Sequence, residues 1–211
     1  MSQYAFYLDA DRCVGCKTCL VACKDKKDLK PGRKFRRVYT CASGEWKPTT
    51  NGNYTHKNVF GYSVSISCNH CKEPACMAAC PADAIVKCDD GIVYIMQSRC
   101  TGCGACAEAC PYEAPSMNKD TGKMDKCDFC RELVGTGEKP VCVTSCIMRA
   151  LDCGEYEELL RKHPENNVSF PPLPDPELTF PAIIITPNRR ITTDTEASMT
   201  ELKEAVRASN D

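Results

Sequence analysis

Sixteen of the nineteen cysteines in this chain fall into four tetrads with spacing typical of metal ligands. Thiolates bind zinc or iron, and cysteines two or three residues apart can direct several sulfurs at one centre. The odd number of cysteines argues against a disulfide scaffold. The tetrads are Cys13, Cys16, Cys19 and Cys23; Cys68, Cys71, Cys76 and Cys80; Cys100, Cys103, Cys106 and Cys110; and Cys127, Cys130, Cys142 and Cys146.

The third tetrad has the spacing C-x2-C-x2-C-x3-C-P, closed by Pro111, which is that of bacterial ferredoxins with [4Fe–4S] clusters. In two-cluster ferredoxins the fourth cysteine of such a run ligates the other cluster, because a short helix carries it away from the first three. The second tetrad lies directly before the third and is closed by Pro81. The two tetrads therefore predict a pair of clusters with crossed ligation.

The first tetrad repeats the third, with the same spacing and with Gly15 matching Gly102, although Lys24 stands where Pro111 closes the later copy. The fourth tetrad has the spacing C-x2-C-x11-C-x3-C, which by itself suits a zinc ribbon as well as an iron–sulfur cluster. Because the central tetrads are already paired by proximity, the first and fourth remain for each other. This predicts one two-cluster module inserted within another.

The elements that must hold these cysteines are short. Apolar runs over residues 4–8, 35–40, 58–67 and 150–153 favour strands, and residues 155–163 have the composition of a helix. Residues 84–87 and 92–96 flank Asp-Asp-Gly, which predicts a hairpin, and a second hairpin is expected around residues 119–122. Residues 42–57 are expected to be turns and loop, and residues 195–209 a short amphipathic helix.

The predicted fold class is α+β, with two nested ferredoxin-like modules of two [4Fe–4S] clusters each, short hairpins and short helices. The outer module comprises residues 1–57 and 112–163, and the inserted module comprises residues 58–111. Residues 164–187 contain seven prolines and a single short apolar run. Such a segment has too little apolar surface for a core of its own, so residues 164–211 are expected to form an extended arm that lies on a partner.

Composition excludes several classes of function. The 211 residues carry a net charge of −1, so nothing favours nucleic acid as a partner. No run approaches the roughly 18 apolar residues that span a bilayer, and the N-terminus lacks the pattern of a signal peptide. If the protein works outside the cytoplasm, we expect a partner to carry it there. The chain shows no constellation of acid, base and nucleophile, so we expect no catalysis by this chain itself.

Several residues have ordinary interpretations. Cys41, Cys88 and Cys153 are expected to be small buried side chains. His70 lies within the second tetrad and is expected to be solvated or hydrogen-bonded rather than a ligand, because four cysteines are already present. Residues 24–37 contain eight basic and two acidic residues, which suits a solvated surface, a docking patch or positive charge near a cluster. Charged residues beside the cysteines, such as Lys126, could tune cluster potentials.

With all four tetrads in order, the chain resembles the iron–sulfur electron-transfer subunits of the dimethyl sulfoxide reductase family, which includes those of formate dehydrogenases, thiosulfate reductases and nitrate reductases. The resemblance runs from about residue 3 to about residue 189. It is closest to the dimethyl sulfoxide reductase branch, through the CKTC motif, residues 28–37 and the SISCNHC motif at residues 65–71. It departs from the family at Ile147, where a proline is common.

The resemblance implies which cysteines share a cluster. It also implies four [4Fe–4S] clusters rather than three and a three-iron centre, because Cys103 stands where the nitrate reductase branch has tryptophan. The implied sets are Cys13, Cys16, Cys19 and Cys146 for cluster 1; Cys23, Cys127, Cys130 and Cys142 for cluster 2; Cys68, Cys71, Cys76 and Cys110 for cluster 3; and Cys80, Cys100, Cys103 and Cys106 for cluster 4.

The resemblance further implies two partners: a large catalytic subunit that holds a molybdopterin cofactor, and an integral-membrane anchor that oxidises quinol. The expected location is peripheral, on the outer face of the cytoplasmic membrane, with export on the catalytic partner; a cytoplasmic location is the alternative. The catalytic partner is expected to reduce an organic acceptor such as a sulfoxide or N-oxide. The alternatives are the same relay role beside a formate dehydrogenase or another molybdopterin reductase, a stand-alone polyferredoxin, and a structural zinc module.

Overall fold

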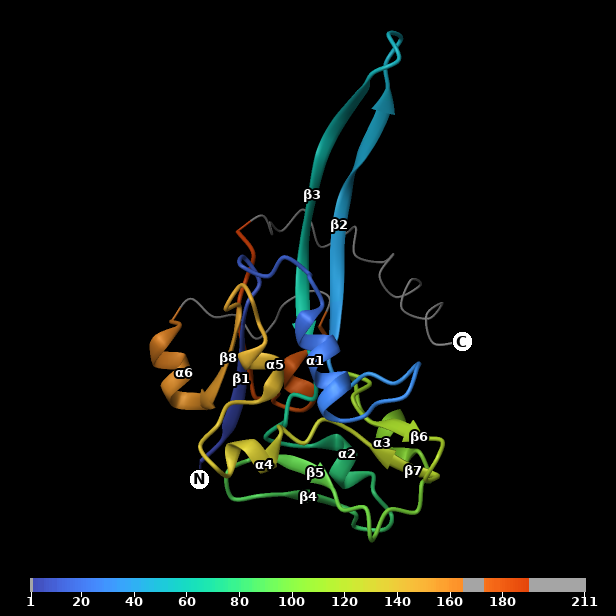
Figure 1. The fold of residues 1–211 in the computed structure, drawn as a ribbon, viewed down its shortest axis with the longest axis vertical. Coiled ribbons are helices and arrows are strands. Elements are labelled where there is room, and N and C mark those ends of the chain that lie inside the picture. Colours follow the sequence, from blue (N-terminus) through green and yellow to red (C-terminus); the bar gives the residue numbers. More distant parts are fainter. Residues whose placement is uncertain (1, 165–172, 190–211) are drawn as a thin grey trace.

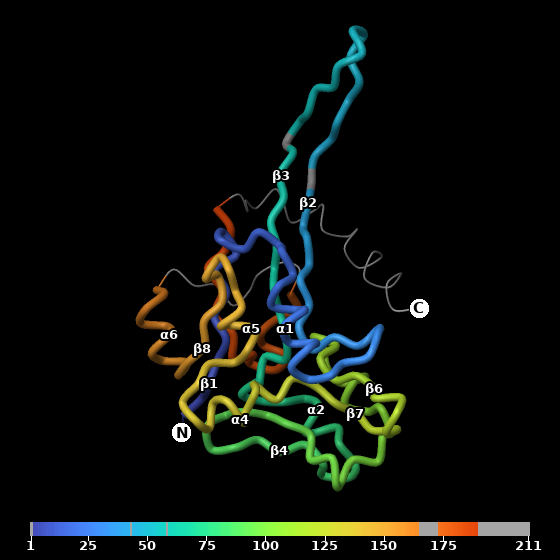
Figure 2. Tube along the Cα trace, viewed as in Figure 1, coloured from blue at the N-terminus to red at the C-terminus, as the bar shows by residue number. Residues whose placement is uncertain are grey.

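The computed structural model describes residues 2–164 and 173–189, and Figure 1 shows a rounded body from which one long β-hairpin projects. The expected helix over residues 195–209 lies outside the described residues. In Figure 2 the segment that carries the second and third tetrads gathers at the lower end of the body. The N-terminal strand and the segments on either side of residue 150 lie above it. The body is thus a mixed arrangement of short helices and short strands.

A three-stranded sheet closes the upper part of the body. β1 (Tyr4–Asp9) is its middle strand; β8 (Leu151–Glu155) pairs with it in antiparallel fashion and β9 (Ile183–Thr186) in parallel. Alternate residues of β1 face two different apolar clusters, with Phe6 and Leu8 on one side and Ala5 and Tyr7 on the other. Burial on both faces explains why this strand is a continuous apolar run. The strands expected over residues 4–8 and 150–153 are confirmed.

The described part of the C-terminal segment differs from an arm that lies on a partner. Ile183, Ile184 and Ile185 are at most 2% exposed because β9 belongs to the chain's own sheet. Before β9, the short 3-10 helix η1 (Pro176–Leu178) is capped by Asp175, whose side chain accepts a hydrogen bond from the backbone N–H of Glu177 at 2.9 Å. Three consecutive isoleucines therefore anchor this segment, although the prolines before them form no core.

The long hairpin is the largest departure from the sequence-based expectation. β2 (Arg37–Pro48) pairs with β3 (Tyr54–Ile66) in a register that runs from Arg37 opposite Ile66 to Pro48 opposite Tyr54. Residues 42–57, expected to be loop, form its outer half, so that prediction was wrong. The register shifts by one residue between Ser43 and Glu45, where residues 58 and 59 of β3 lie opposite Gly44 (φ 108°) alone, and pairing then continues to a tight turn after Thr49.

The small hairpins were predicted correctly. β4 (Ile85–Lys87) pairs with β5 (Val93–Ile95), and Gly91 in the turn has a φ of 79°, which favours glycine. β6 (Ser116–Asn118) pairs with β7 (Lys123–Asp125) in the same way. The two hairpins pack beside the central tetrads, where their buried residues supply the apolar wall that a short helix alone could not.

Six α-helices occur in the described residues, and four of them carry the third cysteine of a tetrad. α2 (Ala75–Ala78), α3 (Ala105–Glu108) and α5 (Val141–Thr144) are each four residues long, and the fourth cysteine is the second residue after the end of each. α1 (Thr18–Lys26) is longer and continues through its fourth cysteine, Cys23. α4 (Arg131–Val134) begins after Cys130, and α6 (Tyr156–Lys162) confirms the helix expected over residues 155–163.

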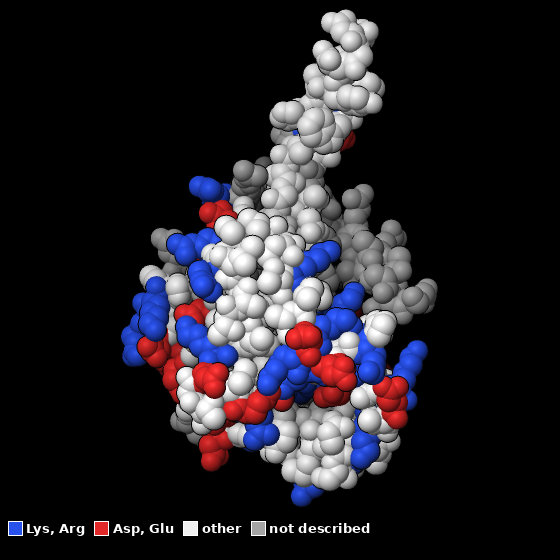
Figure 3. All heavy atoms as spheres, viewed as in Figure 1, with Lys and Arg blue, Asp and Glu red and all other residues white. Residues whose placement is uncertain are grey.

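Figure 3 shows how charge is distributed over one face of the molecule. Basic and acidic side chains are interspersed over the body, whereas the projecting hairpin carries few charges.

Candidate metal centres

The loop of the first tetrad is shaped by the end of β1. The Asp9 carboxylate accepts hydrogen bonds from the backbone N–H groups of Asp11 and Arg12, both at 3.0 Å, and so turns the chain. Gly15 and Lys17 then take φ values of 68° and 62°. These left-handed residues keep the loop non-helical until α1 begins, which places Cys13 and Cys16 in the loop and Cys19 on the helix.

The first and fourth tetrads meet because α1 packs against α5. Burial raises the pKa of the Cys13 thiol, and the neighbouring thiols of Cys19, Cys146 and Cys16 raise it further. These four form what we call the Cys13 group. Three of its members come from the first tetrad and the fourth, Cys146, from the last. Cys16 is exposed, whereas Cys19 and Cys146 are buried.

A second group combines the same two tetrads in the opposite sense. Burial raises the pKa of Cys23 to about 12, with further contributions from the thiols of Cys142 and Cys130. Burial also raises the pKa of Cys127, with Cys23 and Cys142 among its neighbours. We call these four the Cys23 group. All four of its members are buried.

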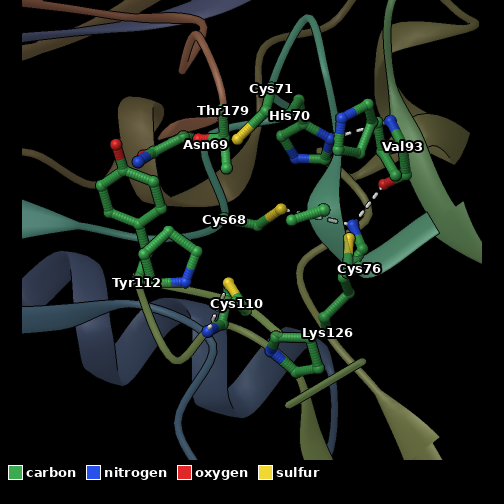
Figure 4. Close-up of a pocket in the computed structure, with 15 residues that line it drawn as sticks. Cys68, Asn69, His70, Cys71, Cys76, Val93, Cys110, Tyr112, Lys126 and Thr179 are labelled. Carbon is green, nitrogen blue, oxygen red and sulfur yellow. Dashed lines mark hydrogen bonds between the residues drawn. The ribbon is translucent and has the colours of Figure 1, made fainter. Parts of the chain in front are cut away.

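A third group lines a cavity between the loops of the central tetrads, shown in Figure 4. Its members, the Cys68 group, are Cys68, Cys71, Cys76 and Cys110. Burial raises the pKa of Cys71 to about 11 and that of Cys76 to about 12, and in both cases the neighbouring thiols of Cys68 and Cys110 raise it further. The cavity is closed by Tyr112 and Thr179.

The fourth group, the Cys80 group, lines a separate cavity and comprises Cys80, Cys100, Cys103 and Cys106. Burial raises the pKa of Cys106 to about 11, and the thiols of Cys100, Cys103 and Cys80 add to it. Backbone N–H groups donate to two of the sulfurs, from Ala84 to Cys80 at 3.3 Å and from Met124 to Cys100 at 3.4 Å. Cys103 is exposed.

Two buried cations lie among these groups. Lys126 is 2% exposed, and its Nζ donates to Cys68 Sγ at 3.3 Å and to the carbonyl oxygens of Cys127 (3.1 Å) and Val93. Burial alone would lower the pKa of Lys126, but the thiols of Cys68, Cys127 and Cys76 raise it above its ordinary value. Lys126 therefore lies between the Cys68 group and the Cys23 group.

Arg36 occupies the corresponding place between the two outer groups. It is 2% exposed, donates to Ser65 O at 3.3 Å and to Ser67 Oγ at 3.0 Å, and lies 4.7 Å from the ring centroid of Phe6. Burial opposes its charge, yet the thiols of Cys142, Cys19 and Cys127 raise its pKa. Among the described residues, neither Arg36 nor Lys126 forms an ion pair with a carboxylate.

The buried cations test whether the groups suit an iron–sulfur cluster. A buried charge without a counter-charge costs several kcal/mol, so Arg36 and Lys126 require negative charge nearby. Thiolates that hold a cluster supply it. Buried donors point to the same conclusion, because Arg36 Nε, Asn69 Nδ2 and His70 Nε2 lack a hydrogen-bond partner within the described part of the chain. The groups therefore fit an anionic, hydrogen-bond-accepting centre.

His70 is a structural residue beside the Cys68 group. It is 1% exposed, and burial lowers its pKa well below the ordinary value, so the ring is neutral. Its Nδ1 accepts a hydrogen bond from the backbone N–H of Val93 at 3.0 Å, which places the proton on Nε2. The hydrogen-bonded interpretation is confirmed and the solvated one is wrong.

A single metal ion is a poor fit to the same cysteines. Within residues 2–164 and 173–189, no three Cys, His, Asp or Glu side chains are placed to hold one ion. Zinc requires sulfurs about 2.3 Å from one point, whereas a cubane needs its cysteines more widely spaced because iron and sulfide fill the centre.

No helix in these ranges is long and apolar enough to cross a membrane.

Sequence reasoning missed Arg36 and Thr179 as residues of these sites. Arg36 belongs to a basic run typical of a surface, and nothing local marks it as the buried member. Thr179 comes from a segment more than a hundred residues from the Cys68 loop, to which that segment is joined by hydrogen bonds from Glu73 N to Thr179 O (3.1 Å) and from Lys72 N to Phe180 O (2.8 Å). Of the remaining cysteines, Cys41 is buried as expected, whereas Cys88 and Cys153 are half-buried.

Comparisons with known proteins point to the same chemistry. Residues 59–156 match the 4Fe-4S dicluster domain family, and residues 4–25 match the 4Fe-4S binding domain family. The protein is 48% identical over 205 residues to one subunit of the anaerobic dimethyl sulfoxide reductase of Escherichia coli K12, which covers 96% of this chain and 98% of the relative. The corresponding subunit from Haemophilus influenzae is 44% identical, with 97% and 100% covered.

A more distant relative comes from a different reductase. The thiosulfate reductase electron transfer subunit of Salmonella typhi is 38% identical over 158 residues, which covers 74% of this chain and 78% of the relative. The chain is therefore similar to subunits that belong to two different reductases.

Proposed function

The protein belongs to the family of iron–sulfur electron-transfer subunits of anaerobic dimethyl sulfoxide reductases, and on this premise we propose that it holds four [4Fe–4S] clusters in a row. It is an electron-transfer subunit of a reductase complex and is not catalytic by itself. Each cluster, when bound, accepts and releases one electron at a time. The chain supplies the thiolates, the spacing and the local charge.

The proposed ligands are the four cysteine groups. The Cys13 group holds cluster 1, the Cys23 group cluster 2, the Cys68 group cluster 3 and the Cys80 group cluster 4. The observation that carries this assignment is that thiols from tetrads far apart in sequence are mutual neighbours: Cys146 with Cys13, and Cys23 with Cys127. The two central cavities are likewise lined by cysteines from both central tetrads.

The proposed order of the clusters follows from contacts between groups. Cys19 of the Cys13 group has Cys142 of the Cys23 group as a neighbour. Cys127 of the Cys23 group in turn has Cys68 as a neighbour. α2 carries Cys76 of the Cys68 group, α3 carries Cys106 of the Cys80 group, and the two helices pack against each other. These contacts support a single row from the Cys13 group to the Cys80 group.

The nested arrangement is part of the proposal. Residues 58–111 would form an inserted module for clusters 3 and 4, and residues 1–57 with 112–163 the outer module for clusters 1 and 2. The pairing of β1 with β8 supports this, since it joins the two halves of the outer segment across the insertion. Residues 164–211 would form the proposed extended C-terminal arm, although its strand β9 returns to the chain's own sheet.

We further propose that this relay connects a molybdopterin catalytic subunit, which reduces a sulfoxide or N-oxide, with a quinol-oxidising membrane anchor. The complex would lie on the outer face of the cytoplasmic membrane. The names of the relatives, which include dimethyl sulfoxide and thiosulfate reductases, support a catalytic partner of this kind. The direction of electron flow would be toward that partner.

The test is a metal count on the native complex, purified anaerobically through a tag on this chain. Four clusters require about 16 irons in this subunit. Iron near or somewhat above that number, with one molybdenum or tungsten and a large co-purifying chain, is the expected result. About half that iron would refute four clusters, and zinc in place of iron would refute the relay. Iron without molybdenum or tungsten would refute the molybdopterin partner alone.

A further inference from the structure

A groove of about 1040 Å³ runs across the body at the foot of the hairpin. It is walled by the start of α1, by residues 30–34, by the lower end of β2 and by residues 113–120. Six cations and two carboxylates line it, which gives an excess of four positive charges. The cations are Lys17, Lys30, Arg33, Lys34, Arg37 and Lys119.

Half of these cations are already paired. Arg33 lies 3.3 Å from Asp125, Arg37 lies 3.8 Å from Glu113, and Lys30 lies 3.6 Å from Asp28. Lys17, Lys34 and Lys119 form no ion pair with any described residue, although the molecule as a whole is nearly neutral. A concentration of unpaired positive charge in a concave surface attracts an anionic partner.

The shape of the groove favours an extended polypeptide. β2 pairs only with β3 among the described strands, so no described strand pairs with its other edge. Residues 37–40 of β2 line the groove, whereas no residue of β3 does. An unpaired strand edge can accept an additional strand through backbone hydrogen bonds. A flat lipid surface would satisfy neither the concave shape nor the strand edge.

We propose that this groove binds an extended, acidic segment of a partner polypeptide, which adds to the edge of β2 and places its carboxylates on Lys17, Lys34 and Lys119. Lys17 directly follows the exposed Cys16, and Lys119 belongs to the β6–β7 hairpin beside the central tetrads. A segment bound here contacts both halves of the body and brings its own subunit next to the Cys13 group. The proposal stands whatever the number of clusters.

Zero-length crosslinking tests the proposal on the native complex. A carbodiimide joins a lysine amine to a carboxylate with loss of water, so it records only direct ion pairs. We expect Lys34 and Lys119 to be joined to Asp or Glu residues of a partner chain, and this joining to fall when the salt concentration is raised to about 0.5 M, where charges are screened within a few ångströms. Crosslinks from these lysines only to this chain's own carboxylates would overturn the proposal.

Binding to defined probes supplies the second test, on the full-length chain with its metal centres in place. One probe is a fluorescent peptide of twelve residues that alternates Glu and Val; the other has Gln in place of Glu. The double variant Lys34→Glu/Lys119→Glu is compared with Lys47→Glu/Lys162→Glu, which reverses two exposed lysines outside the groove. We expect the groove variant to weaken binding of the acidic peptide at least tenfold and the control to leave it unchanged.

Four results would overturn the proposal. The first is equal binding of the acidic and Gln peptides. The second is equal binding of the acidic peptide by both double variants. Alternatively, vesicles of phosphatidylglycerol would bind through Lys34 and Lys119 while the peptide did not, which would identify a lipid surface. Finally, binding of the peptide only after removal of residues 190–211 would make this chain's own C-terminal segment the occupant. The metal count of the complex is independent of all these outcomes.

Discussion

The cysteine groups at the two ends of the proposed row differ from the two in its middle. The Cys13 group and the Cys80 group each contain one exposed cysteine, Cys16 and Cys103, and no other cysteine of the chain is exposed. The Cys23 group and the Cys68 group contain no exposed cysteine, and Lys126 lies between them. Each end group thus exposes one cysteine, whereas the cysteines of the two middle groups are buried or half-buried.

The difference does not come from the local backbone, which is left-handed before the second cysteine of every tetrad. The exposed Cys16 and Cys103 directly follow Gly15 and Gly102, which have positive φ values. Cys71 and Cys130 likewise follow positive-φ residues, His70 and Phe129, yet neither is exposed. Cys130 of the Cys23 group is 5% exposed, and α4 begins directly after it. A relay needs contact with partners only at its ends. The same cysteine motif gives an exposed or a buried ligand, depending on which segments of the chain pack over it.

The largest effect is expected from Cys103→Ser, which removes an exposed end ligand. A hydroxyl is a poor ligand for iron, so the Cys80 group should lose its cluster or convert it to a three-iron centre, with a loss of up to about 4 of about 16 irons. Iron analysis and electron paramagnetic resonance measure the loss, and quinol-coupled turnover should slow. Cys88→Ser is the matched control, because Cys88 is half-buried and belongs to no tetrad. An unchanged spectrum in Cys103→Ser would contradict the assignment of cluster 4.

Lys126→Met tests the buried cation between the Cys23 group and the Cys68 group. The substitution keeps the apolar stem and removes the charge, so reduction of the neighbouring centres becomes less favourable and their midpoint potentials should fall. At about 6 Å and an effective dielectric constant near 20, one charge contributes about 3 kcal/mol, or roughly 100 mV for a one-electron couple. Redox titration followed by electron paramagnetic resonance measures the shift.

Lys119→Met is the control for this experiment, because Lys119 is exposed and lies in the turn of the β6–β7 hairpin. The midpoint potentials of the metal centres in the Lys119→Met variant should match those of the unmodified protein. Equal shifts in both variants would show that Lys126 acts through general surface charge and not through its buried position.

The two equivalent glycines of the end groups should differ in their response to alanine. Both require a positive φ, which costs a residue with a Cβ about 1–2 kcal/mol. At Gly102 the Cβ would collide with the backbone carbonyl of Gly122, which cannot move away easily; at Gly15 it would meet the Ser63 hydroxyl, which can rotate. Gly102→Ala should therefore lower the thermal unfolding temperature more than Gly15→Ala does. The reverse order would show that the Gly15 loop is the more rigid one.

The smallest expected effect concerns an ion pair on the surface of the Cys23 group. Lys27 Nζ lies 3.1 Å from Glu132 and joins the end of α1 to α4. Burial raises the pKa of Glu132, but a backbone hydrogen bond and Lys27 together lower it below its ordinary value. The stability that Glu132 contributes is therefore present above its unfolded pKa of about 4.3 and is lost as pH falls through the lower folded value.

Glu132→Gln should accordingly lower the unfolding temperature slightly at pH 7, by the equivalent of less than about 1 kcal/mol, because the pair is half-exposed. Comparison of thermal unfolding of the two proteins between pH 7 and pH 3 measures this, and their curves should converge in acid. A difference that grows as pH falls would have the wrong sign for this ion pair.

Local sequence predicted the elements whose information is local. The Asp-Gly turn specified the β4–β5 hairpin, and the apolar run over residues 4–8 specified β1. It failed for residues 42–57, because Gly, Asn and Thr favour turns locally, whereas register with the opposite strand extended β2 and β3 through this stretch. The three isoleucines before Thr186 looked too few to form a core, and they do not form one alone; they complete a sheet begun by β1.

The amino-acid sequence alone specifies which atoms can bind iron, because ligand identity and the spacing of two or three residues are covalent properties of the chain. It also predicted that the first and fourth tetrads belong together, by elimination. Which thiols are buried and which are exposed depends instead on the folded structure. So does the fact that Arg36 and Lys126, and not other basic residues, lie buried among the sulfurs. Burial depends on packing between segments more than a hundred residues apart, such as β1 with β9, and no local pattern records it.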